Sequence, residues 1–190
     1  MNFDSFFTFL QEKTSISQQG WEAMLPILSE QKMSKGDFIL TEGQICQKLC
    51  FVKSGAFRAF YLQDGKEINN EFFLENSIAT DHESLTTQQP SRLYIEALES
   101  VSGIVLHRDD LIELYKLSPD LQAVGRDLLS LLLIERNRYA SLFTLNTPTE
   151  RYHYLLENRP DILERIPLQF IASYLGMARE TLSRIRRKIS

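Results

Sequence analysis

Two arginines and a glutamate close to the C-terminus have side chains suited to hydrogen bonding with nucleic-acid bases. They are Arg179, Glu180 and Arg184 in the segment Arg-Glu-Thr-Leu-Ser-Arg. Arginine donates two hydrogen bonds to O6 and N7 of guanine, and glutamate accepts one from N4 of cytosine. On a helix Glu180 and Arg184 lie one turn apart and share a face. This pattern predicts a base-reading surface; the alternative is a solvated helix on which Glu180 and Arg184 form only an ion pair.

The sequence around these residues has the pattern of a helix-turn-helix. Residues 166–185 read as helix, glycine turn and helix, with the small Ala172 at the expected crossing and Gly176 able to adopt the left-handed turn conformation. In such a motif the second helix enters the major groove with its first residues facing the bases. The side chains expected to contact bases or phosphates are Gln169, Arg179, Glu180, Ser183, Arg184, Arg186, Arg187 and Lys188.

Charge is divided unevenly along the 190 residues. The whole chain carries a net charge of −4, which by itself argues against a uniformly basic nucleic-acid binder. Residues 151–190 hold eight basic and four acidic side chains, a net +4, whereas residues 1–150 hold thirteen basic and twenty-one acidic ones, a net −8. An acidic body with a basic end predicts two units with different tasks.

The other residues with reactive side chains form no recognisable catalytic or metal-binding motif. Cys46 and Cys50 have C-x3-C spacing, but a metal or iron–sulfur site needs about four ligands and the sequence has no further cysteine. The three histidines, His82, His107 and His153, are scattered. We therefore expect two half-buried cysteines in strands, no disulfide framework, no metal and no enzymatic activity.

The middle of the chain, from about residue 32 to 106, has the sequence pattern of short antiparallel strands. Runs rich in β-branched and aromatic residues are separated by glycine turns, and Asp64-Gly65 is the strongest hairpin signal among them. The turns lie at 35–37, 42–43, 54–55 and 64–65. Strands at this spacing predict a sandwich, barrel or roll. Helical patterning precedes them, at Phe3–Leu10 and at Trp21–Leu28.

A long helix is predicted after a short one at 109–117. Ser118-Pro119-Asp120 provides an N-cap, a proline at the first helical position and an acid in the first turn, and the helix should run to about Thr144. Its middle is apolar nearly all round, so it must be covered on more than one side, by the β-region and by a partner copy. The alternative is a central helix in a monomeric core. The ridge assigned to dimerisation is Leu121, Val124, Leu128, Leu131 and Leu132, to which Leu129, Leu133 and Ile134 add apolar surface.

A second signal for the start of a helix follows the long helix. Thr147-Pro148-Thr149-Glu150 contains a capping box, and the helix it opens should end before Arg159-Pro160, which places a hinge at 143–148. The predicted fold class is α+β. An N-terminal antiparallel β-roll flanked by helices occupies residues 1–117, a dimerisation helix and hinge occupy 118–146, and an all-α helix-turn-helix domain occupies 147–190.

These features together resemble the Crp/Fnr family of bacterial transcription regulators, over nearly the whole chain. Residues 32–106 resemble that family's cyclic-nucleotide-binding β-roll, a double-stranded β-helix, and residues 118–144 resemble its dimerisation helix. The segment 179–184 resembles its recognition element, in which the first arginine, the glutamate and the second arginine contact bases. The resemblance implies a homodimeric transcription regulator that binds a palindromic DNA site, with Gln169 near the DNA backbone and RNA polymerase as a further partner.

The sequence departs from the family pattern in the effector pocket. Nucleotide-binding members carry a Gly-Glu pair, which holds the ribose, and an Arg-Ser pair, which holds the cyclic phosphate. Here Thr80-Asp81 stands at the first pair and Ser91 at the arginine position, with Arg92 one residue late and therefore on the opposite face of a strand. Loss of the charge-assisted phosphate contact disfavours a cyclic nucleotide. A remodelled pocket for an unknown effector, or a relic pocket with none, would be lined by Thr80, Asp81, His82, Glu83, Ser91 and Arg92.

Further expectations concern cofactors, partners and location. No N-terminal cysteine cluster supports iron–sulfur sensing and nothing indicates haem, so no cofactor is expected. Many family members continue into a β-hairpin wing, whereas this sequence stops at Ser190, so the cluster at 186–188 should carry more of the DNA affinity. The sequence has no membrane-length apolar run and no basic start of a signal peptide, which predicts a cytoplasmic protein without a membrane partner. The competing interpretation is a ligand sensor that signals through protein–protein contact, its basic end binding an acidic partner without specific DNA binding.

Overall fold

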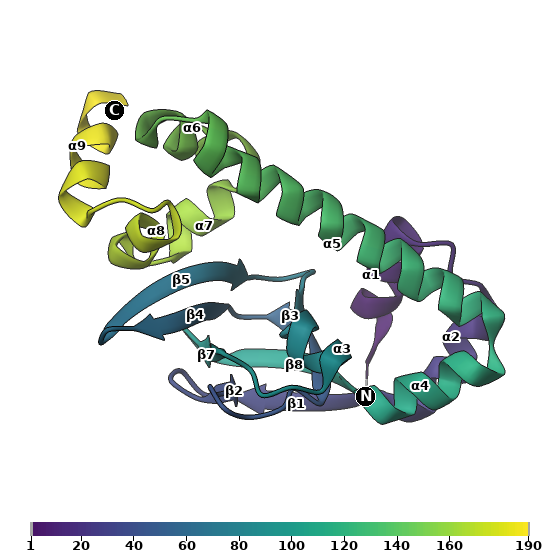
Figure 1. Ribbon diagram of the computed structural model, residues 1–190. Coiled ribbons are helices and arrows are strands. Elements are labelled where there is room, and N and C mark those ends of the chain that lie inside the picture. The colour runs from purple at the N-terminus through teal and green to yellow at the C-terminus, as the bar shows by residue number, and fades with distance from the viewer. Residues whose placement is uncertain (1, 190) are drawn as a thin grey trace.

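The computed structural model describes residues 2–189. Two short helices and a 3-10 turn come first, then a β-roll with one inserted helix, and then a series of helices that ends the chain (Figure 1). The helices are α1 (Asp4–Lys13), α2 (Gln18–Met24), η1 (Leu25–Ile27), α3 (His82–Thr87), α4 (Arg108–Leu117), α5 (Pro119–Leu145), α6 (Pro148–Asn158), α7 (Pro160–Arg165), α8 (Leu168–Tyr174) and α9 (Arg179–Ile189). The strands are β1 (Ser29–Met33), β2 (Phe38–Leu40), β3 (Lys48–Ser54), β4 (Phe57–Gln63), β5 (Lys66–Phe73), β6 (Ile78–Ala79), β7 (Leu93–Ala97) and β8 (Val101–His107).

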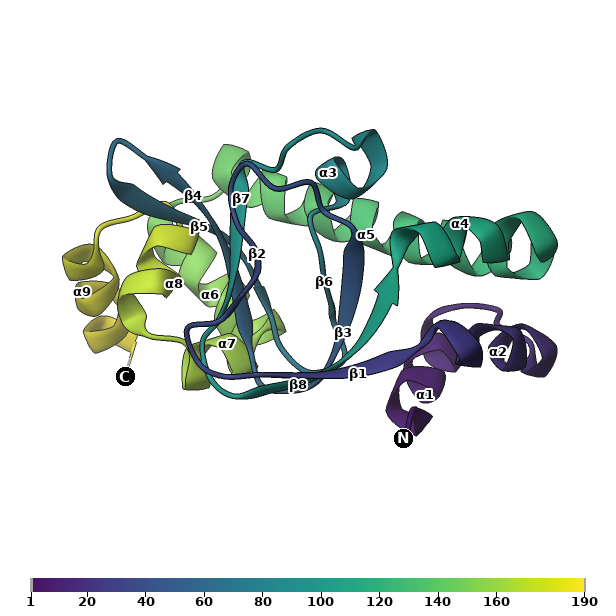
Figure 2. The same ribbon diagram turned by 90° about the horizontal axis from the view of Figure 1, so that it is seen from below.

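The strands form two four-stranded antiparallel sheets that fold into a roll (Figure 2). One sheet has the order β1-β8-β3-β6 and the other has the order β2-β7-β4-β5. Inward-facing residues of both sheets, among them Phe57, Phe73, Ile95 and Val105, enclose an apolar core. The predicted α+β fold with an antiparallel β-roll is therefore confirmed.

The β4–β5 hairpin matters for function because it faces the C-terminal helices. Gln63 pairs with Lys66, so the loop consists of Asp64 and Gly65 alone, with φ of 51° and 74°. Two consecutive positive φ values are typical of a type I′ turn, whose twist matches that of the flanking strands. β5 is the outermost strand of its sheet, so the backbone groups along one of its edges are free to bond to another element.

A second apolar core joins the outer side of the other sheet to the N-terminal helices and to α5. Phe51 of β3 lies under Phe6 of α1, with ring centroids 4.9 Å apart, and Trp21 of α2 packs edge-on against Phe6 at 6.1 Å. The Ser17 and Ser118 hydroxyls cap α2 and α5, accepting hydrogen bonds from the amides of Gly20 and Leu121. This core fixes the first half of α5 on the roll.

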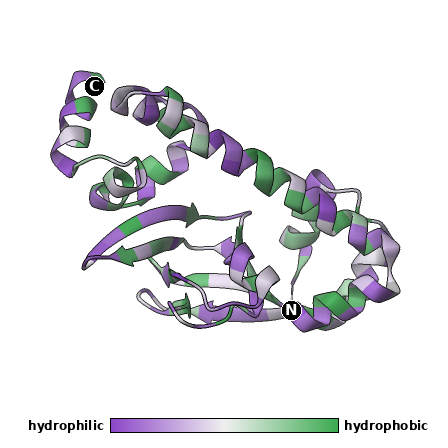
Figure 3. Ribbon diagram, viewed as in Figure 1, coloured by the Kyte–Doolittle hydropathy of each residue, from purple (hydrophilic) through white to green (hydrophobic). Residues whose placement is uncertain are grey.

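The exposed surface of α5 differs from the one the sequence assigned to a partner. Leu121 and Val124 are 0% and 2% exposed in the core just described, and Leu128 packs against it, because this ridge of the helix faces the chain's own roll. Leu133 and Ile134 are 58% and 48% exposed, in the apolar middle of α5 (Figure 3). The exposed apolar surface of α5 therefore lies away from Leu121 and Val124, which are not available to a partner copy. Leu129 and Leu131 are also exposed, and Leu132 is half-buried.

The break between the long helix and the C-terminal helices is short. α5 ends at Leu145 and α6 begins at Pro148, within the predicted hinge. The Thr147 hydroxyl accepts a hydrogen bond from the Glu150 amide, and the Glu150 carboxylate accepts one from the Thr147 amide at 2.6 Å, which confirms the capping box. Over residues 2–189, no helix is both long enough and apolar enough to span a membrane.

Candidate nucleic-acid interface

The predicted helix-turn-helix consists of α8, a glycine turn and α9. Gly176 has φ of +64°, its amide donates to the Ser173 carbonyl, and the Met177 amide donates to the Ala172 carbonyl, both at 3.0 Å. This pair of bonds is a Schellman motif, which ends α8 and needs a residue that tolerates the left-handed conformation. The glycine therefore sets the angle at which α9 leaves α8.

Packing makes this unit rigid. Leu182 and Ile185 on the inner side of α9 are 0% and 7% exposed, and they share a core with Ile171, Ala172 and Leu175 of α8 and its surroundings. The core continues into α6 and α7 through Tyr152, Leu155 and Ile162. Because α9 is fixed by its apolar side, its opposite side is presented to solvent in a defined orientation.

The residues predicted to read bases gather on that outer side. Arg179, Glu180 and Arg184 are all exposed, and Glu180 and Arg184 form no ion pair with each other in the described part of the chain. Ser183 is half-buried, Gln169 is exposed near the start of α8, and the last turn of α9 carries the exposed cations Arg186, Arg187 and Lys188.

Three other arginines of the basic segment have structural partners. Arg151 donates to the Leu175 carbonyl at 3.0 Å and to the Asn146 carbonyl at 3.2 Å, so it ties the end of α8 to the end of α5. Arg165 pairs with Glu75 and Glu99 of the roll, and Arg159 pairs with Asp161. The charge count alone could not separate these arginines from the exposed cations of α9.

The first helix of the motif rests on the β-roll. Ser173 Oγ accepts a hydrogen bond from the Asn69 amide at 3.0 Å and donates one to the Glu67 carbonyl at 3.2 Å, so it bridges the open edge of β5. The Arg58 guanidinium of β4 lies 4.0 Å from the ring centroid of Phe170. These contacts fix the orientation of the helix-turn-helix relative to the roll, and no pattern in the sequence predicted them.

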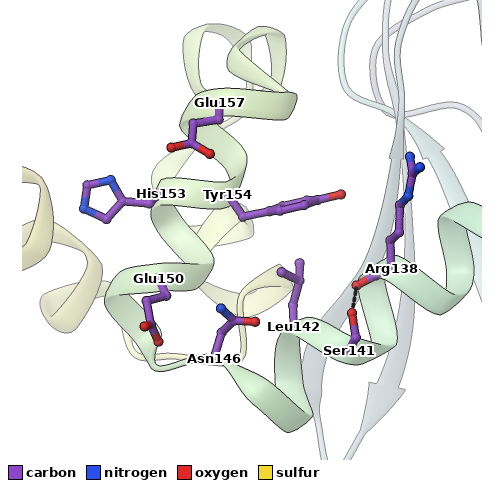
Figure 4. A pocket seen from close by; sticks show the side chains of 8 residues that line it. All are labelled: Arg138, Ser141, Leu142, Asn146, Glu150, His153, Tyr154 and Glu157. Carbon is purple, nitrogen blue, oxygen red and sulfur yellow. Dashed lines mark hydrogen bonds between the residues drawn. The ribbon is translucent and has the colours of Figure 1, made fainter.

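Two grooves border the C-terminal helices. One, of about 310 Å³, lies between the start of α6 and α9; it is lined by Pro148, Thr149, Thr181, Arg184, Ile185, Lys188 and Ile189. The other, of about 580 Å³, lies in the bend between α5 and α6 (Figure 4). In this second groove His153 and Tyr154 point in opposite directions and the Glu150 carboxylate is occupied by the capping box, so its side chains do not converge on one ligand position.

The predicted effector residues only partly come together. Asp81 is 7% exposed and caps α3: one carboxylate oxygen accepts from the amides of Glu83 and Ser84, at 3.1 and 3.3 Å. Its other oxygen accepts from the hydroxyl of Ser91, itself 3% exposed, at 2.6 Å. The polar groups that would face an effector are thus already satisfied by the protein. The remaining candidates lie apart from this pair.

Those remaining candidates have other surroundings. The Thr80 hydroxyl donates to the Lys48 carbonyl at 3.1 Å. His82 and Glu83 are exposed on α3, and Arg92 is exposed with its guanidinium 6.0 Å from the ring centroid of Tyr61. Ser91 and Arg92 both come before β7, which begins at Leu93, so neither lies on a strand face.

We expect Asp81→Ala to destabilise the fold by about 2–3 kcal/mol. The substitution removes an N-cap and the nearer acceptor of the buried Ser91 hydroxyl, at 2.6 Å, and leaves that hydroxyl only the Leu93 carbonyl at 3.3 Å. Chemical denaturation of the parent and the variant measures this loss. Asp81→Asn keeps an oxygen that can accept from the α3 amides and should lose less than half as much; equal stability of Asp81→Ala and the parent would contradict the structural role.

The two cysteines are structural. Cys46 and Cys50 are 4% and 1% exposed and unbonded to each other, and burial raises the pKa of the Cys50 thiol to about 11. Cys46 lies in the loop before β3 rather than in a strand. Within residues 2–189, no three potential metal-ligating side chains lie together.

Comparison with known proteins finds a domain family that the roll resembles. The sequence profile of the cyclic nucleotide-binding domain matches residues 30–118, the stretch from β1 to the start of α5. Residues 30–118 are therefore similar in sequence to that domain. A search of curated proteins finds no match to this sequence.

Solved structures resemble the chain over most of its length. FixK2 from Bradyrhizobium japonicum has a TM-score of 0.72 at 20% identity, covering 86% of this chain and 84% of FixK2. The c-di-GMP-responsive regulator CLP from Xanthomonas campestris has a TM-score of 0.68 at 19% identity, covering 91% of each chain. The catabolite activator protein of Thermus thermophilus has a TM-score of 0.57 at 21% identity, covering 92% of this chain and 84% of that one. The chain is thus Crp/Fnr-like in fold, as its sequence suggested.

Proposed function

We propose that this Crp/Fnr-like protein is a sequence-specific DNA-binding transcription regulator. The observation that carries the proposal is α9, which is fixed by a buried apolar side and presents Arg179, Glu180 and Arg184 outward. A carboxylate on a surface that faces DNA is repelled by phosphate groups unless a base donor lies opposite it, so Glu180 between two arginines favours base reading over general phosphate binding. The resemblance to solved regulators supports the same proposal through the fold.

Each side chain has a proposed role. Arg179 and Arg184 donate to guanine, and Glu180 accepts from cytosine. Gln169 and Ser183 lie beside them, at the start of α8 and on α9. The cations at 186–188 would contact phosphates, and Lys188 also lines the groove between α9 and the start of α6, where it lies beside Arg184.

We propose that two copies associate through α5. The exposed apolar side chains Leu133 and Ile134 lie on the side of α5 that the roll leaves free, and a long amphipathic surface of this kind needs a partner. A two-fold axis along α5 would place two α9 helices in successive major grooves, about 34–36 Å apart. The target would then be a palindrome.

The three segments predicted from the sequence remain part of the proposal. Residues 1–117 would be the sensor unit, 118–146 the dimerisation helix and hinge, and 147–190 the DNA-binding unit. The roll does not fit a cyclic nucleotide in the manner of nucleotide-binding family members, because Asp81 and Ser91 bond each other where ribose and phosphate ligands are needed. We therefore propose that DNA binding does not require a cyclic nucleotide.

Lys188→Ala is expected to weaken binding to all duplexes to a similar degree. A phosphate contact carries no sequence information, so the slope of log K against log salt should fall by about 1 while sequence preference stays unchanged. Fluorescence anisotropy with a preferred and a random duplex at several salt concentrations measures both quantities. If Lys188→Ala lowered affinity for the preferred duplex alone, the proposed division of roles on α9 would be wrong.

A gel-shift series on random and palindromic duplexes tests the function itself. The proposal predicts a preferred sequence. The competing interpretation, a ligand sensor with a protein partner, predicts weak binding without preference, and that result would overturn the proposal.

A further inference from the structure

The free side of α5 has the spacing of a coiled-coil seam. Leu121 and Leu142 are buried and Leu128 packs against the core that holds α5 on the roll, so these residues, which lie whole heptads apart, mark the covered side of the helix. On the opposite side, exposed side chains recur from 126 to 144 at alternating intervals of four and three residues, which are the intervals of the a and d positions of a coiled coil. We call these side chains the seam: Ser130, Asn137 and Thr144 at a, and Arg126, Leu133 and Ala140 at d.

Apolar side chains lie beside the seam. Leu129 is at a g position and Ile134 is at an e position, and both are exposed, as is Leu133 in the middle of the seam. In a parallel two-stranded coil, a g residue of one helix meets the e residue of the next heptad on the other helix. A second copy of α5 would therefore place its Ile134 on Leu129 and its Leu133 on Leu133, which covers the exposed apolar side chains of both copies.

The charges at the start of the seam fit a second copy in parallel orientation. Arg126 is exposed and forms no ion pair among the described residues. Asp127, at the following e position, accepts hydrogen bonds from Ser15 through Oδ2, which leaves its other oxygen free. A d side chain packs beside the d and e residues of the facing helix, so Arg126 of each copy can pair with Asp127 of the other. An antiparallel copy would instead bring the uncharged segment around Thr144 to Arg126.

Asn137 is the polar side chain in the middle of the seam. Its amide group has no hydrogen-bond partner among the described residues, whereas the Ser130 hydroxyl one heptad earlier already donates to the Arg126 carbonyl at 2.8 Å. A residue on a two-fold axis faces the same residue of the second copy. Because a carboxamide has both a donor and an acceptor, two Asn137 side chains that face each other can form a hydrogen bond.

We propose that Asn137 pairs with Asn137 of a second copy and thereby selects the parallel, in-register dimer of α5. In an antiparallel pair with Arg126 opposite Thr144, Asn137 would lie against Leu133, and its amide would be covered without a partner. An asparagine at an a position lowers the stability of a coiled coil but specifies its register and its number of strands. The inference rests on the proposed association through α5 and adds what determines its direction.

The direction of pairing decides whether two reading helices can meet one duplex. The helices α6 to α9 all follow the C-terminal end of α5, which has 27 residues and is about 40 Å long. Parallel pairing places both α9 helices at the same end of the dimer. Antiparallel pairing would place them at opposite ends, where they could not contact successive grooves of one duplex.

Cysteine cross-linking of the full-length protein tests direction and register. Ser130→Cys and Thr144→Cys, made separately, keep Asn137 and should each give an intermolecular disulfide under mild oxidation, because in-register pairing brings every seam residue to its own copy. The two positions are two heptads apart, so no antiparallel pair can bring both to their own copies. Asn158→Cys, at an exposed site on α6 outside the seam, should give none, and the native Cys46 and Cys50 are buried.

Asn137→Leu tests the role of the amide itself. Leucine removes the buried polar group, so the dimer Kd from sedimentation equilibrium should fall by about tenfold. Both cross-links should form in lower yield, because leucine no longer disfavours the antiparallel pair. The matched control Ala140→Leu adds the same side chain at a d position and keeps Asn137, so it should lower Kd without loss of either cross-link.

The outcomes separate this pairing from the proposed function. A dimeric parent in which neither Ser130→Cys nor Thr144→Cys cross-links, or full cross-linking in the Asn137→Leu background, would overturn the pairing and leave DNA reading by α9 intact. A monomeric parent would overturn the pairing together with the proposed dimer. If both cross-links form and no duplex is preferred, the proposed function fails and the pairing stands.

Discussion

Ile134→Asp is expected to convert the protein from a dimer to a monomer. Ile134 is 48% exposed within one chain, so its replacement should change the stability of the fold little. In a two-fold interface the substitution places two like charges in an apolar contact, which costs about 3 kcal/mol or more. The dimer Kd should rise at least about a hundredfold. Sedimentation equilibrium measures it directly.

The same variant should lose tight binding to a palindromic duplex while keeping weak binding to a half-site. A matched control is Leu62→Asp, which introduces the same charge at a side chain of similar exposure, 47%, on the β4–β5 hairpin. Leu62→Asp should remain dimeric. A dimeric Ile134→Asp protein would show that the exposed side of α5 is not the association surface.

Arg179→Ala is expected to lower affinity for the preferred duplex by about 1–3 kcal/mol and to relax the preference at one base pair of each half-site. The physical reason is that alanine cannot replace two parallel hydrogen bonds to guanine. Anisotropy titrations against the preferred duplex and single-base variants of it measure both effects. Two half-sites are affected in each dimer, so the loss can approach twice the single-site value when the sites are independent.

Two control variants separate the effect of base reading by Arg179 from the effect of removing a positive charge. Lys35→Ala removes one positive charge from an exposed turn of the roll and should leave sequence preference and affinity nearly unchanged. Lys188→Ala should weaken preferred and random duplexes alike. If Arg179→Ala also weakened both alike, α9 would bind phosphates and would not read bases.

The sequence predicted best where local chemistry decides the conformation. Asp64-Gly65 occupies a two-residue turn with both φ values positive, and Gly176 ends α8 in the left-handed conformation, because these residues tolerate what the turn requires. The capping box at Thr147 and Glu150 formed for the same local reason. Glu180 and Arg184 could be assigned to one face because the 3.6-residue period of a helix brings residues four apart together, with Arg179 beside them at the start of the helix.

The sequence predicted least where position in the fold decides. Strand β1 is an edge strand of mostly polar, exposed residues, Ser-Glu-Gln-Lys-Met, and edge strands show little apolar alternation. Both sides of α5 are apolar, so the pattern could not reveal that Leu121 faces the chain's own core and Ile134 faces outward.

Selection of bound sequences from a pool of random duplexes tests the central claim most directly. We expect enrichment of a palindrome whose half-sites are centred about 10 base pairs apart. Each half-site should contain a G·C base pair whose selection is lost with Arg179→Ala. Two results would contradict the assignment of α9 as a DNA-reading helix. One is that no sequence is enriched, and the other is that Arg179→Ala and Glu180→Ala select the same sequence as the parent.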